Sequence, residues 1–317
     1  MKFLDNKTKE LESYLPELTR KPDFDEFWER NRKKSNQIPL NVRLEPLWNP
    51  FDNVESYDVW YTSSDEATTC HGIFIKPKNA VGKIPVVILF HGFTWYCGQV
   101  ADHLQYVNMG MAVLSMDHRG QNGASPDCHG YKTGGFGVMS HGVEDPEDYY
   151  FKWSILDGFR AIDYVLSRDD IDANKLFVHG GSQGGAMSFS VACLDERVKY
   201  CFCDVPSNTN IERRIENEHG SFGQVADYLR RHPDKIETVY NTLSYFDTMN
   251  MADKCKADVY ASVGLRDNTC PAICYYAAYN RLTCKKHIEI YPYAGHEGGG
   301  YNYNNKKLKF MYDIING

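Results

Sequence analysis

The chain has 317 residues, with 35 lysines and arginines against 42 aspartates and glutamates, which gives a formal net charge of -7. This length suits one large α/β domain or two modest ones, and the acidic balance offers no electrostatic footprint for nucleic acid. No run approaches the roughly 18 apolar residues of a membrane span. The polar N-terminus, without the apolar stretch of a secretory signal, predicts a cytoplasmic protein.

A cytoplasmic location favours free thiols over a disulfide framework for the 10 cysteines. Two close pairs are conceivable metal ligands, Cys201 with Cys203 and Cys270 with Cys274. In a strand, however, Cys201 and Cys203 are two small side chains on one face, and the paired CxxC spacing of a zinc site is missing from the sequence. We therefore expect no metal and no other cofactor.

The first 41 residues predict an N-terminal helical cover. Their charged and aromatic pattern is typical of an amphipathic helix that packs Phe24, Phe27 and Trp28 on one side. Two β-rich runs follow at Val54–Tyr61 and Thr69–Ile75, and the polar residues between them predict an antiparallel hairpin.

From residue 84 onward the sequence predicts a mainly parallel, doubly wound sheet. Ile84–Phe90 is continuously apolar, which is typical of a strand buried on both faces. Further strands are predicted at Met111–Met116, Leu176–His179, Tyr200–Val205, Ala257–Val263 and Lys286–Tyr291. A long helix is predicted over Asp148–Arg168. The whole chain, residues 1–317, is interpreted as one α/β domain with insertions.

Two segments interrupt this pattern. Residues 123–147 hold many glycines and follow no helical or strand period. So long an irregular loop in a compact domain is usually functional or an interface, and the alternative is a mobile surface loop. Residues 207–253 turn polar and helical, which predicts a helical cap inserted into the core fold.

The strand at Leu176 runs into Gly180-x-Ser182-x-Gly184, a sequence typical of a nucleophile elbow. The two glycines lack a Cβ, so a strand can turn sharply into a helix and hold the serine strained with its Oγ exposed. By itself the pattern is weak in a chain with 25 glycines, and a tight turn with an idle serine is the alternative.

A nucleophilic serine needs a histidine to take its proton and an acid to orient that histidine. The chain order expected on this kind of sheet is Ser, then Asp or Glu, then His. Asp267 and His296 each follow a predicted strand beyond Ser182. Both therefore fall where a parallel sheet presents functional groups, and we predict the triad Ser182, Asp267 and His296.

Other candidates fit less well. Asp253 and Asp258 lie before or inside a strand, where the sheet directs them away from its carboxyl edge. Glu297 is too close in sequence to the histidine to orient it easily. His91 and His118 also follow strands, but both precede the serine.

Acyl transfer also requires preorganised donors for an oxyanion, usually two backbone N–H groups. Gln183 supplies the amide after the nucleophile. The second donor is predicted at the Phe93 amide, because Gly92 lets the backbone of that loop approach closely. The alternative is that Gly92 merely permits a turn.

These residues resemble the acetyl xylan esterase and cephalosporin-C deacetylase family, carbohydrate esterase family 7, within the α/β-hydrolase fold. The motifs of that family stand here as Arg119-Gly120-Gln121, Gly180-Gly181-Ser182-Gln183-Gly184 and His296-Glu297. Further similarity lies in Phe24–Trp28, Gly98–Val100, Asp145–Tyr150, Asp267–Pro271 and Tyr279-Asn280, so the resemblance spans nearly the whole chain.

The resemblance implies Ser182 as nucleophile, Asp267 as orienting acid and His296 as base, with the oxyanion on the Phe93 and Gln183 amides. It implies supporting roles for Arg119, Gln121, Gly180 and Gly184. We expect Arg119 to be a buried guanidinium paired with loop carbonyls or a carboxylate. The family commonly has Tyr at the position of Phe93, so any hydrogen bond from that phenol to the substrate is lost here.

The expected activity is a metal-independent serine esterase that deacetylates O-acetylated xylo-oligosaccharides and related small esters, including cephalosporin C, through an acetyl-serine intermediate. Alternatives are a broad small-acyl carboxylesterase or serine peptidase, or a non-catalytic binding protein on the same fold. The resemblance also implies a homo-oligomer, a hexamer whose active sites face an internal chamber, with residues 123–147 at the interface. No nucleic-acid or membrane partner is expected.

Overall fold

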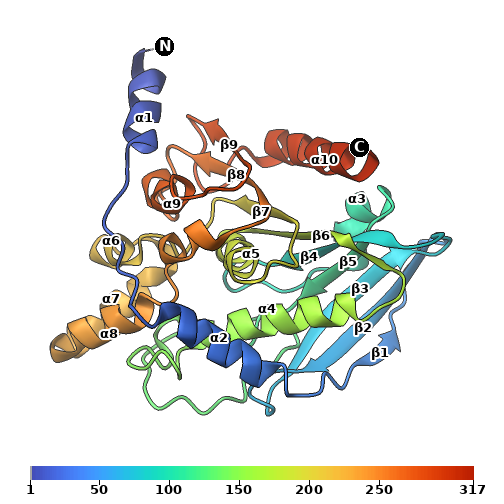
Figure 1. Ribbon diagram of the computed structural model, residues 1–317, viewed down its shortest axis with the longest axis horizontal. Coiled ribbons are helices and arrows are strands. Elements are labelled where there is room, and N and C mark those ends of the chain that lie inside the picture. The colour runs from blue at the N-terminus through green and yellow to red at the C-terminus, as the bar shows by residue number, and fades with distance from the viewer. Residues whose placement is uncertain (1) are drawn as a thin grey trace.

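The computed structural model describes residues 2–317, and a nine-stranded sheet runs through them in the order β1-β2-β3-β5-β4-β6-β7-β8-β9 (Figure 1). The strands are β1 (Arg43–Pro46), β2 (Val54–Thr62), β3 (Thr69–Pro77), β4 (Ile84–Phe90), β5 (Ala112–Met116), β6 (Ile171–Gly181), β7 (Tyr200–Asp204), β8 (Asp258–Gly264) and β9 (Lys286–Tyr291). Strands β5, β4, β6, β7, β8 and β9 are parallel, whereas β1, β2 and β3 pair antiparallel. The predicted mainly parallel sheet and its β2–β3 hairpin are confirmed.

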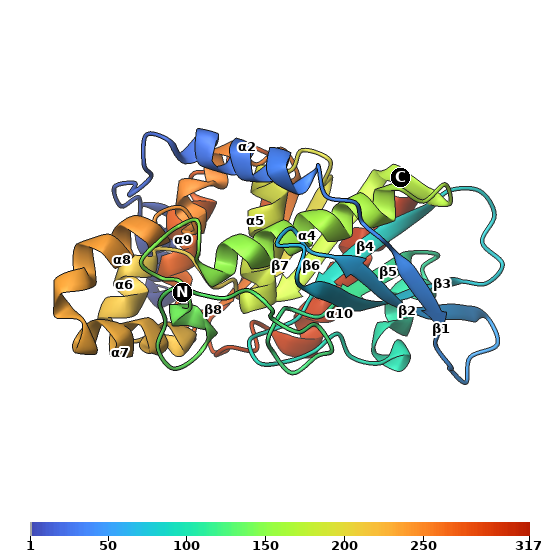
Figure 2. The same ribbon diagram turned by 90° about the horizontal axis from the view of Figure 1, so that it is seen from below.

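Helices cover both faces of the sheet, so it is doubly wound as predicted (Figure 2). One face carries α2 (Phe24–Ser35), α4 (Tyr150–Leu166) and α5 (Gln183–Leu194), and the other carries α3 (Leu104–Val107) and α10 (Gly300–Asn316). The remaining helices are α1 (Lys2–Glu12), α6 (Ile211–Glu216), α7 (Gly223–Arg231), α8 (Ile236–Leu243) and α9 (Ala272–Tyr279). Short 3-10 helices are η1 (Val100–His103), η2 (Val138–Ser140), η3 (Gly220–Phe222), η4 (Pro233–Lys235), η5 (Thr248–Asn250) and η6 (Ala252–Lys254).

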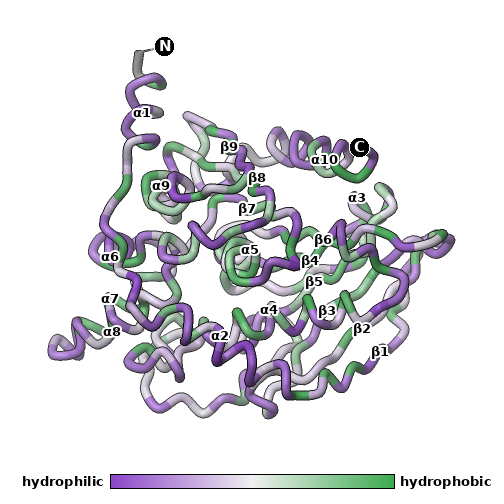
Figure 3. The backbone as a smooth tube through the Cα atoms, in the orientation of Figure 1, coloured by the Kyte–Doolittle hydropathy of each residue, from purple (hydrophilic) through white to green (hydrophobic). Residues whose placement is uncertain are grey.

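The continuous apolar run of β4 feeds two cores, one on each face. Successive side chains of a strand point to opposite faces. Accordingly Ile88 and Phe90 belong to the core beneath α4 and α5, whereas Val87 and Leu89 belong to the core beneath α3 and α10. Hydrophobic residues are concentrated in the central strands, whereas many hydrophilic residues lie along α1 and α2 (Figure 3).

Helix α2, the second helix of the N-terminal segment, packs its predicted aromatic face inward. Phe24, Phe27 and Trp28 are all buried. The Phe27 ring lies 4.6 Å from the ring of Tyr245, and Trp28 lies 5.7 Å from Phe246. These contacts tie α2 to the segment after α8, and α6, α7, α8 and α9 gather at one end of the molecule (Figure 2).

The glycine-rich stretch 123–147 is anchored at its end by Asp148. The Asp148 carboxylate accepts a hydrogen bond from the Lys132 amide at 2.8 Å and pairs with His129 Nε2 at 2.8 Å. Phe136 within the stretch is 83% exposed, so this loop presents a large apolar side chain to solvent.

Among residues 2–317, no helix has both the length and the apolar character needed to cross a lipid bilayer. All ten cysteines are free thiols. Cys201 and Cys203 lie buried in the same core beneath α5, as predicted from their alternation in a strand.

Candidate active site

Ser182 occupies a strained turn between β6 and α5. Its φ is 58° and its ψ is -118°, a conformation that side chains with a Cβ rarely adopt. Two backbone hydrogen bonds hold the turn: the Ser182 amide donates to the Asp204 carbonyl at 2.9 Å, and the Ser182 carbonyl accepts from the Ser207 amide at 3.0 Å. The elbow therefore has the backbone geometry that its sequence predicts.

The glycines of the elbow allow β4 to pack directly against it. A Cβ on Gly180 would overlap the Phe90 carbonyl, and a Cβ on Gly184 would overlap the carbonyls of Phe90 and His91. Both positions thus require the absence of a side chain so that the elbow can approach the carboxyl end of β4.

Gly184→Ala is expected to lower the free energy of unfolding by about 3 kcal/mol, because the added methyl meets backbone that cannot move without disturbing the sheet. Urea denaturation measures this loss. Gly223→Ala in α7 is the matched control, since the closest atom to its added Cβ lies 3.8 Å away. Equal stability of the two variants would contradict this account of the elbow.

Asp267 and His296 form a hydrogen-bonded pair after β8 and β9. His296 Nδ1 lies 2.8 Å from Asp267 Oδ2, and the amides of Thr269 and Cys270 each donate to Asp267 Oδ1 at 2.8 Å. The Asp267 side chain is fully buried, whereas His296 is 37% exposed. Three donors fix the carboxylate, so it can orient the imidazole while the other edge of the ring remains open to solvent.

Ser182 and His296 line one pocket of about 510 Å³. Within residues 2–317 no hydrogen bond joins the two side chains, and the recorded contact of Ser182 Oγ is Cys270 Sγ at 4.0 Å. Such hydrogen bonds are often long in ligand-free enzymes and tighten when substrate binds. The two competing aspartates are engaged elsewhere, since Asp253 pairs with Arg20 and Asp258 with Lys285. Glu297 does line the pocket, where its carboxylate accepts from the Gly295 amide at 3.0 Å.

The two predicted oxyanion donors lie in the same pocket. Phe93 and Gln183 both line it. Gln183 is the first residue of α5, where a helix leaves its amides unpaired and carries a partial positive charge. The Phe93 amide has no backbone partner among the described residues. Both N–H groups can therefore donate hydrogen bonds to a developing oxyanion.

Gln121 links the Gln183 side chain to Thr94, the residue after Phe93. Its Oε1 accepts from the Thr94 amide at 2.7 Å, and its Nε2 donates to Gln183 Oε1 at 3.2 Å and to Tyr150 Oη at 3.0 Å. Thr94 has a φ of 56°, which is unusual for a β-branched residue. Asn122 also donates to the Thr94 carbonyl at 2.6 Å. The strained loop beside Phe93 is thus held by the loop that follows β5.

Arg119 lies beneath the pocket and does not line it. Its guanidinium donates to Asp157 at 2.7 and 2.9 Å and to Asp65 at 2.8 Å, and its side chain is fully buried. Burial raises the pKa of Asp157, although Arg119 opposes this shift. Arg119 therefore pairs with carboxylates and supports the scaffold under the elbow.

Arg214 is a pocket residue that sequence analysis missed. It is 1% exposed, and it donates to Ser207 Oγ at 2.6 Å and to the Thr269 carbonyl at 2.7 Å. Ser207 holds the Ser182 carbonyl, and Thr269 donates its amide to Asp267. Arg214 therefore links the backbone around the nucleophile to the loop of the acid.

A second cluster, also missed, lies beside Ser182, and in it Lys307 is buried whereas His179 and Asp204 are partly buried. Lys307 Nζ contacts Asp204 Oδ2 at 2.7 Å and His179 Nε2 at 2.6 Å, and Lys307 is only 4% exposed. Burial alone would raise the pKa of Asp204, but Lys307 and His179 lower it to about 2. The backbone carbonyl of Asp204 accepts a hydrogen bond from the Ser182 amide, and its carboxylate binds Lys307 of α10. Asp204 therefore connects α10 to the elbow.

The depressed pKa of Asp204 predicts acid sensitivity. A carboxyl whose pKa is lowered on folding contributes stability that is present above its unfolded pKa and lost as pH falls toward the folded value of about 2. We expect the contribution of Asp204, about 2 kcal/mol, to disappear progressively between about pH 5 and pH 2. Urea denaturation at several pH values should give a shallower pH dependence for Asp204→Asn than for the wild type, and identical slopes would contradict the assignment.

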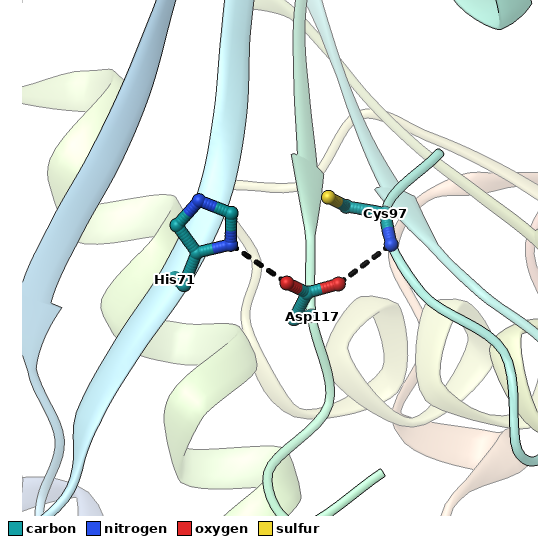
Figure 4. A group of neighbouring side chains, drawn as sticks. All are labelled: His71, Cys97 and Asp117. Atoms are coloured by element: carbon teal, nitrogen blue, oxygen red, sulfur yellow. Dashed lines mark hydrogen bonds and ion pairs between the residues drawn. The ribbon is translucent and has the colours of Figure 1, made fainter. Parts of the chain in front are cut away.

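His71, Cys97 and Asp117 form a cluster with the composition of a metal site (Figure 4), and their potential ligand atoms lie within 4.8 Å of one another. These atoms already bond to each other and to the backbone. Asp117 pairs with His71 Nδ1 at 2.6 Å and accepts from the amides of Cys97 at 2.6 Å and Ala124 at 2.8 Å. His71 Nε2 contacts Asp58 at 3.0 Å, and burial raises the pKa of the Cys97 thiol. The cluster therefore joins β3 to both loops beside the pocket.

Comparison with solved structures gives the class of protein. The chain resembles the alpha/beta hydrolase GrgF from Penicillium sp. sh18, with a TM-score of 0.59 and 16% identity over 83% of this chain and 99% of that one, a likeness of fold. The chain therefore has the α/β-hydrolase fold.

The chain belongs to the acetyl xylan esterase (AXE1) family, which matches residues 1–314. The acetyl xylan esterase from Paenibacillus sp. R4 has a TM-score of 0.92 and 38% identity, over 96% of this chain and 98% of that one. Acetyl esterase Axe7A of Xylanibacter ruminicola is 31% identical over 306 residues, 89% of this chain, and the match spans 66% of Axe7A. The family and these relatives indicate a hydrolytic esterase.

Proposed function

We propose that this chain is a metal-independent serine esterase that removes acetyl groups from O-acetylated xylo-oligosaccharides and related small esters, including cephalosporin C. The observation that carries the proposal is the meeting of three features in one pocket: a strained serine, an aspartate-held histidine and two free amides. Family membership supports acetyl as the acyl group and a carbohydrate as the leaving alcohol.

In the proposed reaction Ser182 Oγ attacks the acetyl carbonyl while His296 takes the serine proton. Asp267 holds the imidazole and stabilises its positive charge. The oxyanion rests on the amides of Phe93 and Gln183. When the C–O bond breaks, His296 returns its proton to the sugar oxygen. Water, deprotonated by the same histidine, then attacks acetyl-Ser182 and releases acetate and the free serine.

The side chains around the pocket favour a small acyl group. The Phe93 ring has no hydrogen-bonding group, so substrate contacts at this position are apolar. Ser207, Ser221 and Thr269 supply hydroxyls on other parts of the wall. A compact apolar surface beside hydroxyls suits an acetyl group attached to a sugar.

The test is mass-spectrometric monitoring of acetate loss from acetylated xylo-oligosaccharides and cephalosporin C, together with p-nitrophenyl esters of increasing chain length and a dipeptide amide. We expect acetate release from the sugars and a steep fall in kcat/KM beyond acetate or propionate. Comparable turnover of long-chain esters would favour a broad carboxylesterase instead. Cleavage of the amide would favour a peptidase, and an inert protein would overturn the proposal.

We also propose, from the family resemblance, that the chain acts in the cytoplasm as a homo-oligomer with residues 123–147 at a subunit interface. Exposure of the apolar Phe136 side chain supports this position for the interface. Sedimentation analysis of the wild type and of Phe136→Asp tests it. We expect the assembly to weaken in the variant, and a monomeric wild type would contradict the proposal.

A further inference from the structure

A second cavity adjoins the pocket that holds Ser182. This adjoining cavity has a volume of about 390 Å³ and lies between the loop after β4, α3 and the end of β6. Its own lining includes Tyr96, Asp102, His103, Gln105, Tyr106 and His179. The two spaces share the lining residues Gly92, Trp95 and Gly181, so Trp95 lies where they meet.

Trp95 keeps most of its large apolar surface in water. Its side chain is 61% exposed, although it belongs to the catalytic pocket. The preceding residue, Thr94, is fixed on both sides by Gln121 and Asn122, and the Trp95 amide donates to the Gly92 carbonyl at 3.1 Å. An aromatic surface held in place at the rim of a pocket and left uncovered is suited to covering by a ligand.

The polar groups beyond Trp95 identify the kind of ligand. The Tyr96 hydroxyl makes no hydrogen bond among the described residues, whereas Gln105 is engaged, because its Oε1 accepts from Asn304 at 3.1 Å and its side chain also bonds to Tyr106. A sugar ring presents C–H groups on its faces and hydroxyls at its edge. An aromatic face next to the free Tyr96 hydroxyl complements both, whereas a long acyl chain would leave that hydroxyl unpaired.

We propose that Trp95 is the platform for a second sugar ring, so that the enzyme binds an acetylated oligosaccharide across both cavities. The acetylated ring lies at Ser182, and the neighbouring unacetylated ring packs on Trp95 and enters the adjoining cavity. This inference rests on the proposed deacetylase function and adds a preference for at least two linked sugars.

The first test compares kcat/KM for acetylated xylobiose, an acetylated methyl xyloside with one ring, and methyl acetate with none. Aryl esters are avoided because their leaving group could itself stack on the indole. We expect the wild type to prefer two rings over one by about tenfold, equivalent to about 1.4 kcal/mol. Trp95→Ala should bring this ratio close to one through a higher KM for xylobiose, and Trp95→Phe should retain part of it.

Trp48→Ala is the matched control, because Trp48 is 83% exposed and lines neither cavity. It should leave the two-ring to one-ring ratio unchanged. A direct measurement uses Ser182→Ala, which still binds sugar. Unacetylated xylobiose should shift its tryptophan fluorescence, and the shift should vanish when Trp95→Ala is added.

The inference is overturned if the wild type turns over all three esters without a ring preference, a result that leaves the esterase function standing. It is also overturned if Trp95→Ala lowers kcat/KM equally for every ester, impairs only long-acyl esters, or changes the subunit assembly while the ratio stays constant. Absence of acetate release from every ester would overturn the proposed function and this inference together.

Discussion

Replacing Ser182 by alanine is expected to lower kcat for acetate release by at least about 10⁴-fold, because the proposed mechanism forms the acyl-enzyme on the Ser182 oxygen. The substitution removes one oxygen whose recorded contact is a thiol at 4.0 Å, so the folded structure should persist. Acetate release from a small ester measures the rate, and circular dichroism with thermal unfolding measures the fold.

Ser221→Ala is the matched control for this experiment. Ser221 lies in the same pocket but away from the elbow, and its loss should lower kcat less than tenfold. A fluorophosphonate probe should label the wild type and Ser221→Ala but not Ser182→Ala. Retention of wild-type turnover by Ser182→Ala would remove this residue from the role of nucleophile.

Arg119→Met is expected to lower the free energy of unfolding by about 3–5 kcal/mol, because it leaves buried carboxylates without the cation that pairs with them. Asp157 and Asp65 are 1% and 4% exposed and depend on this guanidinium. Burial already raises the pKa of Asp157, so removal of Arg119 should raise it further. The deficit should therefore shrink as pH falls and Asp157 takes up a proton. Urea denaturation across a pH series measures both effects.

Two further variants make this prediction specific. Arg230→Met removes an exposed arginine whose ion pairs with Glu218 and Asp227 lie in solvent, and it should leave the free energy of unfolding almost unchanged. Adding Asp157→Leu to Arg119→Met should recover part of the lost stability, because the unpaired charge disappears. A loss in Arg119→Met no larger than in Arg230→Met would show that the buried pairing contributes little.

The central sheet could be predicted from sequence because its strands are unusually uniform. A run such as Ile84–Phe90 is continuously apolar and, with 7 residues, too short for a typical buried helix, so it indicates a strand buried on both faces. The first residue of β6 could not be predicted from the sequence. The strand begins at Ile171, before the predicted Leu176, because the polar residues 172–175 form strand structure despite their composition.

The candidate triad could be predicted from chain order and strand ends, which are local properties of the sequence. The residues that hold the backbone around the triad could not be predicted in this way. Arg214 contacts the carbonyl of Thr269, and Lys307 contacts the carboxylate of Asp204, across 55 and 103 positions of the chain. The periodicity of the sequence does not predict such pairs, because each pair forms only when separate elements meet in the folded molecule. Arg214 in particular resembled an ordinary charge on a polar helix.

The left-handed conformation of Thr94 affects the thermodynamics of activation. Gln121 and Asn122 hold this residue at a φ of 56°, so the neighbouring Phe93 amide is fixed before substrate arrives. Ordering a flexible residue costs about 1–2 kcal/mol of conformational entropy. Here that cost is met during folding, and the transition state need not bear it again. In the proposed mechanism, the loop that carries the Phe93 amide therefore adds little unfavourable activation entropy.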